Sequence, residues 1–82
     1  MERTEIEEKV RSLLIDELEI DEDKVFPDSR LKEDMGIDSL DYVDIVAMVL
    51  STFGVKVNIE KMKGVKTMSQ FVDYLEEELK QK

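Results

Sequence analysis

The 82-residue sequence contains neither cysteine nor histidine. The absence of cysteine excludes disulfide bonds and thiolate chemistry. The absence of histidine removes the commonest general base, and the two absences together remove the commonest zinc ligands. Long apolar stretches are also missing, so no segment is expected to insert into a membrane. We therefore expect a protein that is not an enzyme and has no metal centre.

The N-terminal residues Met1 to Glu5 lack the apolar run of a secretory signal, so the cytoplasm is the expected location. A chain of 82 residues, 41% of them hydrophobic, is expected to form one small domain over residues 1–82. Such a domain has no room for an enclosed active site of any size. We expect it to be a monomer.

Acidic residues are concentrated in the first half of the chain. The formal net charge is −9, which argues against binding to nucleic acid and favours a basic partner. Residues 1–41 hold 15 acidic and 6 basic residues, whereas residues 42–82 hold 6 of each. The two halves are therefore expected to present different surfaces.

The spacing of apolar residues predicts an all-α fold, a small bundle of three longer helices and one short helix with a long loop between the first and second helices. A capping box of Thr4 and Glu7 predicts a first helix that runs to about Glu19. The long loop follows over residues 20–38 and contains the only proline, Pro27. A loop of this length needs anchors in the core. The expected anchors are Val25, Phe26, Leu31, Met35 and Ile37.

The remaining helices are predicted from their end signals. Asp38 is a good N-cap and Gly54 suits a left-handed C-terminal residue, which predicts a second helix between them. A short helix is expected within residues 59–63. Thr67 and Gln70 form a second capping box, which opens a last helix that ends near Leu79.

The most informative stretch, Gly36-Ile37-Asp38-Ser39-Leu40, begins the predicted second helix. It resembles the acyl carrier protein family, in which an Asp-Ser-Leu tripeptide follows a glycine at this place. The resemblance covers most of the chain, including a second helix that ends in Phe53 and a last helix with Asp73-Tyr74. It implies that Ser39 receives 4′-phosphopantetheine from coenzyme A. The protein would then carry acyl groups as thioesters to enzymes of fatty-acid, polyketide or related biosynthesis.

Physical chemistry supports this role for Ser39. A helix N-terminus offers N–H groups and a positive dipole end, which favour a phosphodiester on Ser39. Without histidine or cysteine the serine has no obvious base, so a separate phosphopantetheinyl transferase must modify it. The resemblance also implies that Asp38, Asp41 and Asp44 meet basic patches on this transferase and on acyl-chain synthases and acyltransferases.

The predicted second helix carries two apolar stripes. Ile45, Val49 and Phe53 form the first, and the second consists of Leu40, Val43, Ala47 and Leu50. Only one stripe can face the core squarely, and Phe53 together with the family comparison favours the first. The second stripe is then a partly exposed docking surface. The alternative is one wide buried face, because Val46 bridges the stripes. Tyr42 is expected on the core side, where it restricts a narrow cavity for the acyl chain.

Residues 56–66 depart from the family pattern, because they carry a net charge of +3 where the family is usually negative. Four lysines oppose a lone glutamate in this segment. Together with the end of the second helix it is expected to form a basic and apolar docking surface that includes Leu50, Lys56, Ile59 and Lys63. Such a surface favours a specialised carrier with dedicated partners, whose docking patches are basic or apolar, over the housekeeping carrier.

Two further readings of the site stay open at this point. The chain is alternatively a carrier of aminoacyl groups, of the peptidyl or D-alanyl type, or a helical adaptor in which Ser39 merely caps a helix.

A calcium-binding loop that starts at Asp21 is excluded by its spacing, because its sixth position is Phe26 instead of glycine and its twelfth is Lys32 instead of glutamate. Loose binding of divalent cations to the acidic loop, which would reduce its self-repulsion, stays open as an alternative.

Overall fold

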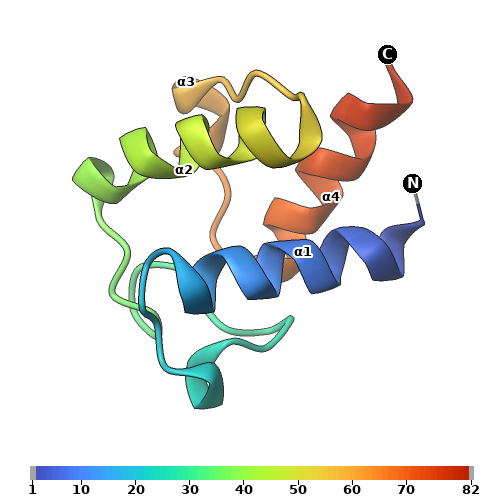
Figure 1. Ribbon diagram of the computed structural model, residues 1–82. Helices are drawn as coiled ribbons and strands as arrows, with labels where there is room; N and C mark the ends of the chain where they lie inside the picture. Colours follow the sequence, from blue (N-terminus) through green and yellow to red (C-terminus); the bar gives the residue numbers. More distant parts are fainter. Residues whose placement is uncertain (1, 82) are drawn as a thin grey trace.

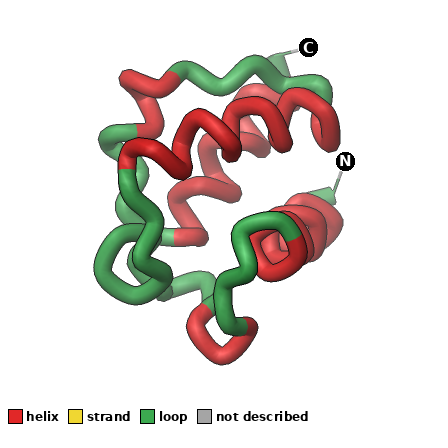
Figure 2. The backbone as a smooth tube through the Cα atoms, turned by 60° about the vertical axis from the view of Figure 1, so that its left-hand side comes forward, coloured by secondary structure: helices red, strands yellow, loops and turns green. Residues whose placement is uncertain are grey.

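The computed structural model describes residues 2–81, which contain helices and no named β-strand. The elements are α1 (Arg3–Asp16), the 3-10 helix η1 (Glu22–Lys24), α2 (Ser39–Phe53), α3 (Ile59–Met62) and α4 (Met68–Lys80). Figure 1 shows α2 above α1, with α4 lying obliquely behind them, and Figure 2 shows that α1 and α2 cross, because one is seen nearly end-on and the other lengthwise. Helix α1 packs against α4, and α2 packs against α3. The predicted all-α bundle of three longer helices and one short helix is confirmed.

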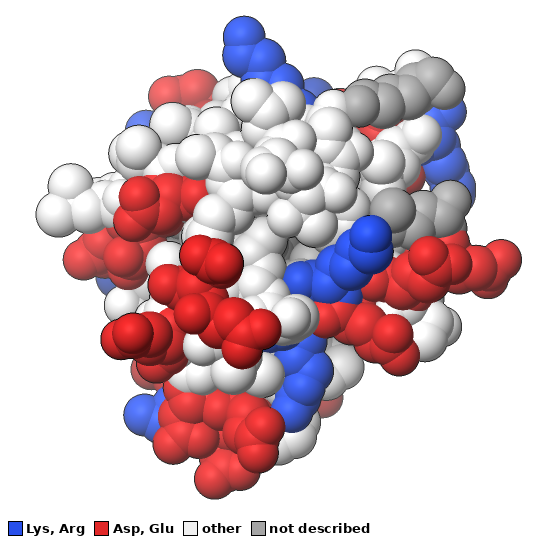
Figure 3. Space-filling model, in the orientation of Figure 1, with Lys and Arg blue, Asp and Glu red and all other residues white. Residues whose placement is uncertain are grey.

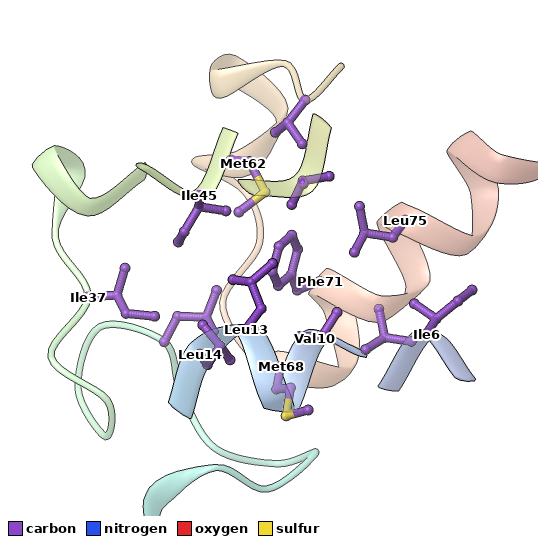
Figure 4. Packing of buried hydrophobic residues seen from close by; sticks show 14 of the residues in the cluster. Ile6, Val10, Leu13, Leu14, Ile37, Ile45, Met62, Met68, Phe71 and Leu75 are labelled. Carbon is purple, nitrogen blue, oxygen red and sulfur yellow. The ribbon is translucent and has the colours of Figure 1, made fainter. Parts of the chain in front are cut away.

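The core forms where the apolar faces of the helices meet. Phe71 of α4 is fully buried and lies at the centre of the cluster. Figure 4 shows its ring above Val10 of α1, with Met62 and Ile45 on the opposite side. Burial of apolar surface stabilises the fold by about 25 cal/mol per Å². Every helix except η1 contributes a buried side chain to this cluster, so the helices depend on one another.

Helix α1 begins and ends earlier than the sequence predicts. Glu2 is the N-cap and forms no side-chain capping bond, so the capping box of Thr4 and Glu7 is wrong. The earlier start lets Arg3 contact α4, where its Nη1 lies 2.6 Å from a carboxylate oxygen of Asp73. The helix ends at Asp16 because the chain reaches a left-handed residue at Glu19, whose φ is 56°.

The long connection folds against the helices at the ends where α2 and α4 begin. Figure 2, in which α1 is seen nearly end-on, shows this loop beside the first turns of both helices. Its backbone is tied to the chain around α4 by several hydrogen bonds. The N–H of Leu31 donates to the carbonyl of Lys66 at 2.9 Å, and the N–H of Met68 donates to the carbonyl of Ser29 at 3.0 Å. The middle of the loop is thus held against the segment that leads into α4.

Four of the five expected loop anchors are buried, and these are Val25, Leu31, Met35 and Ile37. The fifth prediction is wrong, because Phe26 is 52% exposed. A tight turn accounts for the difference. The N–H of Phe26 donates to the hydroxyl oxygen of Ser29, and the N–H of Ser29 donates back to the carbonyl of Phe26. This turn buries the serine and directs the phenylalanine outward.

The predicted end signals of the later helices are mostly confirmed. Gly54 adopts the left-handed conformation after α2, with φ of 70°. The hydroxyl oxygen of Thr67 accepts the N–H of Gln70 at 3.2 Å, as a capping box requires. The reciprocal bond differs, because the Gln70 side chain accepts the N–H of Lys66, one residue earlier than predicted. Helix α4 ends at Lys80, one residue beyond the expected Leu79.

Candidate functional site at the start of helix α2

A reciprocal capping box fixes the start of α2. The carboxylate oxygen Oδ1 of Asp38 accepts the N–H groups of Leu40 at 2.9 Å and Asp41 at 3.2 Å. In return, the carboxylate of Asp41 accepts the N–H of Asp38 at 3.1 Å. Two of the N–H groups at the start of α2, which were expected to favour a phosphodiester on Ser39, are therefore already bonded to Asp38. The positive end of the helix dipole remains at this position.

Ser39 is the first residue of α2 and lies exposed beside this cap. Among residues 2–81, no side chain forms a hydrogen bond with its hydroxyl group. The hydroxyl is thus accessible, and no neighbouring base is placed to remove its proton. This geometry fits a serine that is modified by a separate enzyme rather than a catalytic nucleophile.

A pocket of about 320 Å³ opens beside Ser39. Tyr42, one turn further along α2, also lines it and is half-buried against the core, as predicted. The long loop supplies one wall, and the segment from the end of α3 to the start of α4 supplies another. The complete lining is Lys32, Glu33, Ile37, Asp38, Ser39, Tyr42, Lys63, Val65 and Lys66.

The two stripes of α2 separate as predicted. The buried stripe consists of Ile45, Val49 and Phe53, each with 7% exposure or less. The other stripe faces outward, with Leu40 at 78%, Val43 at 60% and Leu50 at 52%, and Ala47 is exposed as well. The alternative of one wide buried face is wrong. Val46, which was expected to bridge the stripes, is half-buried.

Charge changes along the face that carries this exposed stripe. Asp44 is exposed near the start of α2, whereas Lys56 and Lys63 are exposed beyond its end. Between these lysines, Ile59 at the start of α3 is 41% exposed. Figure 3 shows that uncharged side chains cover much of the face formed by α2, while carboxylates gather lower on the molecule, toward η1. Acidic, apolar and basic side chains are thus all exposed along α2, α3 and the segment between them.

Asp34, in the loop just before the site, is held by Arg30. Its carboxylate oxygen accepts the backbone N–H of Arg30 at 2.7 Å and contacts the guanidinium at 3.4 Å. The backbone hydrogen bond, aided by the side-chain contact, lowers the pKa of Asp34.

Within residues 2–81 no group of acidic side chains is arranged to hold a metal ion. In the same part of the chain, no helix is both long and apolar enough to cross a membrane.

Comparison with known proteins identifies the family. The sequence profile of the phosphopantetheine attachment site matches residues 8–75. An acyl carrier protein of Thermotoga maritima is 40% identical over 77 residues, which cover 94% of this chain and 95% of that protein. The acyl carrier protein of Akkermansia muciniphila is 38% identical over 76 residues, covering 93% and 95%. That of Thermosynechococcus vestitus is 35% identical over 75 residues, covering 92% and 93%. The chain belongs to the acyl carrier protein family.

Membership in the acyl carrier protein family makes the chain a non-catalytic carrier, and 4′-phosphopantetheine is the prosthetic group of its family. The exposed Ser39 and the pocket beside it fit such a group. Sequence reasoning missed two lysines of that pocket, Lys32 and Lys66, as neighbours of the serine. Lys66 is distant from Ser39 in the chain and meets it only in the folded protein, so no local signal could have found it, whereas Lys32 lies in the loop shortly before Ser39.

Proposed function

We propose that Ser39 is the residue that bears 4′-phosphopantetheine and that residues 1–82 form a single acyl-carrier domain. When bound, the arm supplies a terminal thiol that holds an acyl group as a thioester. The observation that carries this proposal is the accessible hydroxyl of Ser39 at the first position of α2, directly beside a pocket. The carrier would deliver its cargo to enzymes of fatty-acid, polyketide or related biosynthesis.

In this proposal the residues of the chain position the serine and leave the chemistry to partners. Asp38 and Asp41 fix the first turn of α2, so the serine is presented on rigid backbone. Ile45 and Val49 anchor the same helix in the core. The chain itself supplies no base to Ser39, so a phosphopantetheinyl transferase would provide the catalytic groups for the transfer from coenzyme A.

The attachment site is tested by mass spectrometry of the intact protein. Incubation of the unmodified protein with coenzyme A and a broad-specificity transferase is expected to add one phosphopantetheine group. Ser39→Ala should abolish the addition. Ser51→Ala, which changes an exposed serine further along the same helix, should leave it unchanged and serves as the matched control. Labelling of the Ser39→Ala protein would refute the assignment.

We also propose a partner surface that follows α2 and α3. The acidic start of α2, with Asp41 and Asp44, would meet basic groups of the transferase and of synthases. The exposed stripe would supply apolar contacts, and the lysines beyond it would select partners that tolerate positive charge. The proposed surface consists of Leu40, Asp41, Val43, Asp44, Ala47, Leu50, Lys56, Ile59 and Lys63. The basic part supports a specialised carrier over the housekeeping one.

A further inference from the structure

The pocket beside Ser39 is lined by more positive than negative side chains. Its charged lining consists of Lys32, Lys63 and Lys66 together with Glu33 and Asp38. Lys32 comes from the long loop, whereas Lys63 and Lys66 come from the connection between α3 and α4. Two segments that are distant in the chain therefore bring positive charge to the pocket beside the attachment serine.

Backbone hydrogen bonds hold these segments together. The bond from the N–H of Leu31 to the carbonyl of Lys66, at 2.9 Å, sets the loop that carries Lys32 against the segment before α4. An isolated antiparallel bridge between Arg30 and Thr67 lies next to it. The lysines are thus placed by the fold and not only by long flexible side chains.

The positive charge in the pocket is only partly neutralised. Among residues 2–81, neither Lys32 nor Lys66 forms an ion pair. The ammonium group of Lys63 lies 3.5 Å from the carboxylate of Glu60, but both side chains are more than half exposed, so this pair is weak. Glu33 and Asp38 offset two of the three lysines, so the lining keeps one positive charge in excess.

The start of α2 alone is poorly suited to a further negative charge. Asp38 and Asp41 already place two carboxylates at the helix N-terminus, so an anion attached to Ser39 would lie among like charges. Lysines on the facing wall of the pocket would offset this repulsion.

The apolar part of the pocket lining is small and consists of Ile37, Tyr42 and Val65. The volume of about 320 Å³ is near the lower limit for ligand pockets, and the lining suits a short polar group better than a long alkyl chain.

We propose that this pocket is an anion-binding site in which Lys32, Lys63 and Lys66 hold a negatively charged group carried on Ser39. The proposal rests on the proposed function, because the anion reaches the pocket through the modified serine. Two groups supply the same chemistry. One is the phosphodiester of the arm, and the other is a terminal carboxylate of a short dicarboxylic acyl group, which is ionised at neutral pH.

Four forms of the protein distinguish these sources: the unmodified form, and forms modified by a broad-specificity transferase from coenzyme A, butyryl-coenzyme A or succinyl-coenzyme A. The butyryl and succinyl groups have four carbons each, and only the second ends in a carboxylate. Intact mass first shows that Ser39 is modified in each sample. A failure at this stage contradicts the proposed function, whereas the pocket is tested only on modified protein.

Backbone amide chemical shifts of Lys32, Val65 and Lys66 report occupation of the pocket. We expect these amides to shift on modification and to lose most of the shift in the double variant Lys63→Gln with Lys66→Gln. The charge-conserving variant Lys63→Arg with Lys66→Arg should restore it. A salt concentration near 1 M, where the Debye length is about 3 Å, should also reduce the shift.

The matched control is Lys56→Gln with Lys61→Gln, which removes the same charge outside the pocket. It should leave the shifts unchanged. A shift found only in the succinyl form identifies the carboxylate of the cargo as the bound anion. Equal lysine-dependent shifts in all three modified forms identify the phosphodiester. Shifts that are the same in the pocket variant, the control variant and the wild type would overturn the proposal.

Discussion

Replacement of Asp38 separates its role as a helix cap from its negative charge. Its Oδ1 accepts two backbone N–H groups, at 2.9 and 3.2 Å, and alanine removes both bonds. Asparagine keeps an acceptor oxygen at the same place and is about as good an N-cap as aspartate. Both Asp38→Ala and Asp38→Asn therefore remove the negative charge, whereas only Asp38→Ala also removes the helix cap.

The expected loss of stability in Asp38→Ala follows from the geometry of the helix cap. Loss of an N-cap costs about 0.5–2 kcal/mol, and because both bonds lie at the exposed end of α2 we expect about 1 kcal/mol for Asp38→Ala. The loss is felt by the whole domain, because α2 supplies Ile45, Val49 and Phe53 to the core. With a slope of about 1 kcal/mol per molar urea for a chain of this size, the unfolding midpoint should fall by about 1 M. Asp38→Asn should lower it by less than about 0.3 M.

Urea unfolding followed by circular dichroism measures both midpoints on unmodified protein. An unchanged slope is needed for the comparison, since a change in slope indicates a different unfolded state. Equal losses in the two variants would show that the charge of Asp38, and not its hydrogen bonds, stabilises the start of α2. An alanine variant as stable as the wild type would refute the capping argument altogether.

Three further predictions concern other parts of the chain. Glu19→Gly should raise the free energy of unfolding by about 0.5–1 kcal/mol in thermal or urea unfolding, because φ is 56° there, whereas Glu17→Gly, at a right-handed position, should lower it. The pKa of Asp34 is lowered in the folded protein. Ionised Asp34 therefore stabilises the fold above its unfolded pKa of about 3.9, and this stabilisation is lost as the pH falls through its folded pKa. Asp34→Asn should therefore lower the urea midpoint at pH 7 and not at low pH, and an equal loss at both would contradict this sign. A housekeeping ketosynthase should use the modified carrier poorly, and Lys56→Glu with Lys63→Glu should improve turnover, more at low salt; efficient turnover of the unchanged carrier would refute the specialised-partner proposal.

Patterns within one element predicted the fold around α2 well. The spacing of Ile45, Val49 and Phe53 identified the buried stripe, and Asp38 and Gly54 marked the ends of the helix. These signals are local, because each depends on residues only a few positions apart. The sequence could therefore indicate both the start of α2 and the exposed face that it presents.

Predictions failed where contacts across the fold decided the outcome. Helix α1 starts earlier than predicted and includes Arg3, which contacts Asp73, a residue that no local pattern connects to it. Phe26 is exposed because its turn with Ser29 buries the serine and directs the phenylalanine outward. The basic lining beside the attachment serine was not predicted for the same reason, since Lys66 meets the loop only through a long-range backbone bond.

The hydrogen bonds between the long loop and α4 have a consequence for how the chain opens. The carbonyl of Pro27 accepts the N–H of Ser69 at 2.9 Å, and the carbonyl of Ser29 accepts that of Met68 at 3.0 Å. The loop therefore supplies acceptors that the first turn of α4 cannot find within itself. A protease needs an unpaired, extended segment, so cleavage near Pro27 would first require these bonds to break. Solvent exchange of the amide protons of Met68 and Ser69 would then report the same opening event.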